Sequence, residues 1–204
     1  MGSPKKLNNK LFINCPFDKD YFPFYQRLVF ILTKNNFSLF FSSSNSLKTT
    51  RIDNIKRLIS KCKYSIHDLS RNKSNSANEY SRLNMPLELG IDIGCATWFK
   101  RNKIITFLVD KKHSHNIFIS DLSGYDPIEH NNDPESLFDT IPVWLSKINH
   151  TPIITPQTLR IGFNKWHSDS VVIFSSWKKE GDTRDVDMTL YYQTLLEWNK
   201  KVKN

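Results

Sequence analysis

The sequence is poor in cysteine and has no long apolar run. Its 204 residues include three cysteines, Cys15, Cys62 and Cys95, which are widely spaced and form no CxxC pair. This odd number, without close pairs, argues against a disulfide framework and favours a reducing compartment. No segment approaches 18 consecutive apolar residues, and residues 1–10 lack the apolar stretch of a signal peptide. We therefore expect a cytoplasmic protein with a flexible N-terminus over residues 1–10 and no membrane segment.

Phosphate-binding glycine motifs and metal-ligand clusters are also missing. Six glycines occur in the chain, and they form neither GxGxxG nor GxxxxGK[ST]. This argues against dinucleotide-binding and phosphate-binding loops of those two kinds. His113 and His115 form an HxH pair that has no further ligand nearby in the sequence. We expect neither a metal nor a bound cofactor.

Positive charge is in excess. The chain has 29 Lys and Arg against 20 Asp and Glu, which gives a net charge of +9. Such a balance favours anionic partners such as nucleotides, nucleic acids or membrane surfaces. The basic residues are scattered, however, and no run is long enough to form a nucleic-acid-binding arm. A small-molecule nucleotide is therefore the partner that we expect, rather than a nucleic acid.

Strand and helix patterns alternate through the first 150 residues. This alternation predicts parallel strands joined by right-handed crossovers, and thus a doubly wound, mainly parallel α/β sheet of the flavodoxin-like type. Ligands of such sheets bind at the carboxyl ends of the strands. The predicted strands are 11–15, 37–41, 64–69, 103–109 and a short one within 117–128, and the predicted helices are 20–35, 51–61, 84–99 and 134–148.

The pattern changes after residue 150. Residues 151–204 predict a C-terminal extension of three helices, the first starting near Pro156 and the second stopping at Gly181. Two interpretations stay open for this aromatic-rich extension. It can pack on the α/β domain of residues 11–150, or it can form a homo-oligomer or partner interface, where Trp and Tyr are favoured. Its aromatic residues are Phe163, Trp166, Phe174, Trp177, Tyr191, Tyr192 and Trp198.

Two carboxylates lie at the ends of adjoining elements. Asp68 ends the strand 64–69, and Glu88 lies in the opening turns of the next helix, for which Asn84 is a plausible N-cap. The predicted topology places both acids on one rim of the strand-end cleft. Glu88 then either faces a ligand or simply benefits from the positive end of the helix dipole. Asp92, one turn further along the same face, either orients Glu88 or is solvated.

Further candidate roles concern the ends of the first and third predicted strands. Asp68 could hold the hydroxyl groups of a ribose, or it could cap the next loop through Ser70. The loop after the first strand offers Asn14, Phe17 and Asp18. An aromatic ring beside polar groups suits stacking on a base, although an ordinary turn with Phe17 in the core is the alternative.

Three stretches carry a resemblance to a known family. They are "LFINCPFDKDY" (11–21), "CKYSIHDLSR" (62–71) and "NMPLELGIDIG" (84–94). Together they resemble the nucleoside 2-deoxyribosyltransferase-like and TIR-like superfamily, in which an acid-ended strand precedes a helix that opens with a [FYML]-E-[LI]-G motif. The resemblance covers residues 11–150. The polar loop 70–83 is long, and no match is found for the residue that the transferases take from a neighbouring subunit.

The resemblance implies a TIR-like fold and chemistry at an N-glycosidic bond. Glu88 would act at the anomeric carbon of a ribose, and Asp68 would hold the sugar or the base. Phe17 and Asp18 would line the base or nicotinamide side, and Arg71 would meet a phosphate. A carboxylate suits this role because breaking the C1′–N bond builds positive charge on the sugar.

Three functions follow from these features. The first is a NAD-type hydrolase or cyclase of a bacterial antiphage defence or toxin system, with NAD as the substrate. The second is a nucleoside 2-deoxyribosyltransferase or nucleoside hydrolase. The third is a module that binds a nucleotide signal without turnover and assembles through its C-terminal helices.

Overall fold

The computed structural model describes residues 9–41, 50–71, 83–111, 114–117, 119–149, 154–179 and 187–202. The chain divides into two compact units. The first consists of Met1–Pro16 and Asn36–Asn131, and the second of Phe17–Asn35 and Asn132–Asn204. The N-terminal residues 1–8, expected to be flexible, lie outside the described residues.

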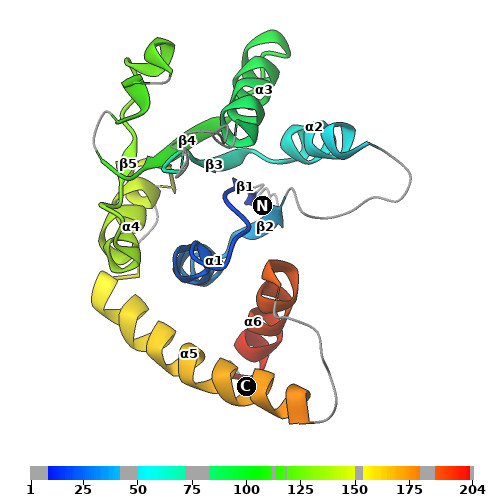
Figure 1. Cartoon of the computed structure of the whole chain (residues 1–204), viewed down its shortest axis with the longest axis vertical. Helices are drawn as coiled ribbons and strands as arrows, with labels where there is room; N and C mark the ends of the chain where they lie inside the picture. Colours follow the sequence, from blue (N-terminus) through cyan, green and yellow to red (C-terminus); the bar gives the residue numbers. More distant parts are fainter. Residues whose placement is uncertain are drawn as a thin grey trace, which may run out of the picture. The chain divides into compact units, whose positions relative to one another are not determined.

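The first unit is built on a parallel sheet of five strands (Figure 1). The strand order is β2-β1-β3-β4-β5, and all four strand pairs are parallel. The doubly wound α/β fold predicted from the sequence is therefore confirmed, with the flavodoxin-like strand order. The strands are β1 (Lys10–Asn14), β2 (Ser38–Phe41), β3 (Tyr64–Asp68), β4 (Ile104–Val109) and β5 (Ile128–Glu129).

Two helices of this unit, α2 (Arg51–Lys61) and α3 (Asn84–Trp98), pack against each other. Phe12 of β1 and Ile55 of α2 share one apolar cluster, to which Ile91 of α3 adds. A second cluster joins Leu89 of α3 to Phe107 of β4. Every residue of β3 is buried, as expected for a central parallel strand that is covered on both faces.

The fifth strand expected at about 117–128 is confirmed as β5, but it lies at the end of that range, at Ile128–Glu129. Two 3₁₀ turns, η1 (Ser114–Ile117) and η2 (Ser120–Leu122), occupy the segment before it. A local side-chain contact favours the first turn, because the Ser114 hydroxyl donates to Asp110 Oδ1 at 2.7 Å. Such side-chain hydrogen bonds offer the chain an alternative to strand pairing.

The second unit is helical. It contains α1 (Phe22–Lys34), the short turn η3 (Pro134–Ser136), α4 (Leu137–Asn149), α5 (Pro156–Lys179) and α6 (Met188–Val202). Helix α5 is continuous, where the sequence predicted two helices. Its polar middle does not break it, since the Ser170 hydroxyl donates to the His167 carbonyl and Asp169 accepts from the Trp198 indole at 2.7 Å.

Four aromatic residues of α5 and α6 lie in the core of this unit, Phe163, Trp166, Tyr191 and Trp198. The side chain of Trp177 lies outside the described residues. Phe163, Trp166 and Tyr191 are at most 3% exposed. The Trp166 indole N–H donates to the Tyr191 hydroxyl at 2.6 Å, so the polar end of each ring is satisfied inside the unit. These three side chains therefore pack inside the unit and are not exposed for an interface. Exposed apolar residues of α5, such as Val171 and Val172, would have to serve any interface there.

Within the described residues, no helix combines the length and the apolar character needed to cross a membrane.

We predict that Trp166→Ala destabilises the second unit by about 3–5 kcal/mol, because it leaves a large cavity and removes the partner of Tyr191. Urea denaturation followed by circular dichroism measures the change. Val172→Ala, on the exposed side of the same helix, is the matched control and should shift stability by less than about 0.5 kcal/mol. An equally small loss for Trp166→Ala would show that this core is not packed as described.

Candidate functional site

Helix α3 presents one buried stripe. Met85, Glu88, Leu89 and Asp92 are all buried, with the spacing of a single helix face. The expectation that Glu88 and Asp92 share a face is therefore confirmed. The expected N-cap is not, because α3 begins at Asn84 itself and its cap position is Leu83, which makes no side-chain capping bond.

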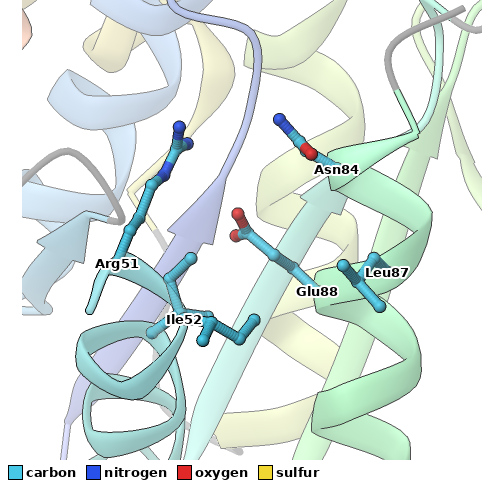
Figure 2. A pocket seen from close by; sticks show the side chains of 6 residues that line it. Arg51, Ile52, Asn84, Leu87 and Glu88 are labelled. Carbon is cyan, nitrogen blue, oxygen red and sulfur yellow. The ribbon is translucent and has the colours of Figure 1, made fainter.

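A pocket of about 210 Å³ opens between the first turns of α2 and α3 (Figure 2). Helix α2 contributes Arg51, Ile52 and Ile55, and helix α3 contributes Asn84, Leu87 and Glu88. Figure 2 shows the Glu88 carboxylate pointing from α3 into the space between the two helices, on the side of Arg51. Both helices begin after the carboxyl end of a strand, which is where ligands of doubly wound sheets bind.

The Glu88 carboxyl group is in an unfavourable place for a charge. The residue is 2% exposed, and its Oε2 atom has no hydrogen-bond partner among the described residues. Burial raises its pKa from 4.5 to about 7, although the positive charge of Arg51 acts in the opposite direction. The surroundings of Glu88 therefore disfavour its ionised form.

A buried chain of polar groups lies behind this pocket wall. Asn14, at the end of β1, donates from Nδ2 to the Met85 carbonyl at 3.0 Å and lies 3.0 Å from His67 Nδ1. Because the carbonyl only accepts, the Asn14 amide must present its N–H groups, so His67 Nδ1 is the acceptor. His67 Nε2 then carries the proton and donates to Asp92 Oδ2 at 3.1 Å.

Lys103 completes this chain on the other side of Asp92. Its ammonium lies 3.1 Å from Asp92 Oδ1 and also donates to the carbonyls of Ile59 and Cys62. Burial tends to raise the pKa of Asp92. His67, Lys103 and Ser65 outweigh it, so that the pKa lies below its usual value. Asp92 is thus a buried ionised group and not a solvated one.

Asp68 is not brought together with Glu88. Its Oδ1 accepts from the backbone N–H and the hydroxyl of Ser70 at 2.8 and 2.5 Å, which confirms the loop-capping interpretation. Its Oδ2 lies 3.7 Å from His130 Nε2. Alternation along β3 points Asp68 away from the face on which His67 meets Asp92 of α3. Asp68 is not among the residues that line the pocket.

The remaining predicted residues are also separate from the pocket wall. Asn14 belongs to the buried chain, and Arg71 is half-buried and does not line the pocket. Phe17 and Asp18 belong to the second unit. There, Asp18 closes a turn by accepting from the Tyr21 N–H at 2.9 Å, while Phe17 is 37% exposed and so lies outside the core.

Arg51 is the site residue that sequence reasoning missed. It is the first residue of α2 and follows the polar segment after β2. The sequence did contain a signal for Arg51: a basic residue at the start of the helix after a parallel strand lies at the ligand-binding edge of the sheet. What the sequence does not reveal is that this helix end adjoins the start of α3, which begins 33 positions further along the chain at Asn84.

No group of three or more His, Cys, Asp or Glu side chains in the described part of the chain could hold a metal ion. His115 is buried, and His113 lies outside the described residues.

No model of a known protein family and no curated protein matches the chain. The resemblance to the nucleoside 2-deoxyribosyltransferase-like and TIR-like superfamily therefore stays a prediction.

We predict that Glu88→Gln stabilises the protein at alkaline pH. The folded-state pKa of about 7 lies above the unfolded value of 4.5, so the contribution of Glu88 to stability is complete below pH 4.5 and is lost as the pH rises through 7. At pH 8 the amide removes a penalty of at most about 3 kcal/mol. Thermal unfolding at pH 5 and pH 8 measures the effect, with the exposed Glu197→Gln as control. Equal melting temperatures for Glu88→Gln and wild type at pH 8 would contradict the assignment.

We also predict that Lys103→Met destabilises the first unit by about 3–5 kcal/mol, because Asp92 is left as a buried charge without its ammonium partner. The double variant Lys103→Met/Asp92→Asn should lose less than the sum of the two single losses. Urea denaturation of the four proteins measures the coupling. Strict additivity would mean that Lys103 and Asp92 do not interact.

Proposed function

We propose that the protein cleaves the N-glycosidic bond of a ribosyl nucleotide, with a NAD-type dinucleotide as substrate. The observation that carries this proposal is the Glu88 carboxyl group, which is buried, has a pKa raised to about 7 and faces a pocket that Arg51 also lines. A raised pKa in a cleft marks a residue whose position is not explained by stability. The resemblance of "PLELG" to the superfamily motif agrees with this role.

The reaction fits a single carboxylate. When the bond between C1′ and the nicotinamide nitrogen breaks, its electron pair stays on that nitrogen and neutralises the pyridinium charge. The sugar becomes an oxocarbenium ion, which ionised Glu88 stabilises or captures as a covalent ester. Water then supplies the hydroxyl group at C1′, and its second proton passes to Glu88 or to solvent. In a cyclase, a hydroxyl or ring nitrogen of the same dinucleotide would replace this water.

The pocket favours NAD over a neutral nucleoside. Cleavage of a nucleoside leaves an anionic base, which needs a proton from a second acid. Among the described residues that line the pocket, Glu88 is the only carboxylic acid, and no described His, Cys, Tyr or Lys accompanies it. Nicotinamide leaves as a neutral molecule and requires no such donor. A deoxyribosyltransferase or nucleoside hydrolase is therefore the second candidate.

Arg51 supports a phosphorylated substrate. It lines the pocket from α2, is exposed, and carries the guanidinium that best matches phosphate oxygens. The pocket volume of about 210 Å³ is below the roughly 300–1,000 Å³ of sites that enclose a whole ligand. It would hold the ribosyl end, while the rest of the dinucleotide extends beyond it. Consumption of NAD in this way would suit the antiphage defence or toxin role.

The test is mass spectrometry of NAD, NADP and a panel of ribo- and deoxynucleosides, before and after incubation with the protein. We expect loss of NAD that rises as the pH passes through about 7, because the ionised form of Glu88 is required. Glu88→Gln should lower turnover by about 10²–10³-fold. Arg51→Gln should raise KM about tenfold with a smaller change in kcat, while Glu197→Gln changes neither.

Two results would redirect the proposal. If wild-type protein binds NAD but turns over no member of the panel, also after concentration to promote assembly, the pocket is a nucleotide-binding module. If deoxynucleosides are consumed and NAD is not, the chain is a transferase or nucleoside hydrolase.

A further inference from the structure

A second hollow of the first unit lies between the C-terminal parts of α2 and α3. This α2–α3 groove has a volume of about 520 Å³. Its apolar residues are Ile59, Ile91, Cys95, Trp98 and Phe99. It shares no lining residue with the Glu88 pocket, which lies at the opposite, N-terminal ends of the two helices.

Two large aromatic rings of the groove remain in water. Trp98 is 82% exposed and Phe99 is 71% exposed. The Trp98 ring lies along its own helix over Gly94, where an added Cβ would be 2.7 Å from Cζ3. Gly94 therefore lets one face of the indole rest on α3 while the other stays open. Exposed aromatic residues over a recess are typical of sites that bind other proteins.

The groove is rimmed by positive charge. Lys56, Arg57 and Arg101 line it, and no acidic residue of the described part of the chain does. Lys56 has Asp53 as a partner at 3.3 Å, whereas Arg57 donates to the Asn54 amide and Arg101 to the Ser60 carbonyl, which are neutral groups. A neighbouring hollow, which shares Ser60 and Arg101, adds the cations Lys61 and Lys63. Charges that are scattered in the sequence thus converge here.

We propose that the α2–α3 groove binds an acidic, apolar segment of a partner protein. Its carboxylates would pair with Arg57 and Arg101, and its apolar side chains would enter the recess beside Trp98. Trp and Arg are the residues that most often dominate protein interfaces.

Two other occupants fit less well. A second copy packed face to face would place the same cations opposite one another. A single-stranded nucleic acid would use the cations and the indole face, but it has no aliphatic or branched groups to fill the recess formed by Ile59, Ile91 and Cys95.

The experiment pans a phage library of random 12-residue peptides on the full-length protein, with counter-selection on the Trp98→Ser/Phe99→Ser variant. We expect enriched peptides that combine net negative charge with aromatic or branched apolar residues. A synthetic peptide of the enriched sequence should bind wild type at least tenfold more tightly than Trp98→Ser or Lys56→Gln/Arg57→Gln, with an affinity that falls as salt is added. Ile117→Ser, an exposed apolar residue outside the groove, is the matched control and should bind as wild type does.

A further variant tests the ring position without removing any groove side chain. Gly94→Ala should weaken peptide binding, because the new methyl group displaces the indole. Circular dichroism verifies that each variant is folded.

Three outcomes would overturn the proposal. The first is that no peptide distinguishes wild type from the double variant, or that the peptides that do so are neutral or basic. The second is a wild-type dimer in sedimentation that Trp98→Ser dissociates, which would assign the groove to a second copy. The third is tighter, Trp98-dependent binding of a dT15 oligonucleotide than of any selected peptide, which would assign it to nucleic acid.

Discussion

The buried polar chain from Asn14 through His67 and Asp92 to Lys103 determines how α3 lies on the sheet. Asn14 holds the Met85 carbonyl in the first turn of α3, and Asp92 is held two turns later by His67 and Lys103. Apolar side chains such as Met85 and Leu89 tolerate small rotations of a helix, because their attraction has no direction. Hydrogen bonds between buried groups do not, since a broken one leaves a polar atom away from water. Glu88 lies between these two points of attachment and thus has a fixed direction.

Glu88 and Asp92 show how far environment separates two carboxyl groups on one helix face. Asp92 has a protonated nitrogen of His67 on one oxygen and an ammonium on the other, and its pKa is lowered despite burial. Glu88 is nearly as deeply buried, and among the described residues the charge that acts on it is that of Arg51, which does not outweigh burial, so its pKa is raised. At neutral pH, ionised Asp92 stabilises the folded protein, whereas ionisation of Glu88 destabilises it. A pair of groups whose pKa values are driven apart in this way often marks the assignment of chemical roles.

The sequence predicted the elements well because most of them depend on local pattern. The apolar run of β3 and the spacing of Glu88 and Asp92 on α3 both appear as expected. What failed were inferences that need contacts between distant segments. Arg51 enters the pocket only because α2 adjoins α3, and His67 reaches Asp92 only because β3 lies beneath that helix. Asp68 shows a different limit. The predicted topology placed it with Glu88 on one rim of the strand-end cleft, whereas strand alternation sends its side chain to the other face of the sheet.

Contacts between distant segments also separate two neighbouring cations near the C-terminal end of α3. Lys103 and Arg101 are two residues apart, yet one is buried and paired with Asp92, while the other is exposed at the rim of the α2–α3 groove. Neither composition nor sequence spacing separates these two roles, because both depend on contacts with the end of α2, a segment distant in the sequence. Glu88 and Trp98 are ten residues apart on one helix, a rise of about 15 Å. Between them, Asp92 attaches the helix to His67 and Lys103, so the pocket and the groove lie on either side of one buried point of attachment.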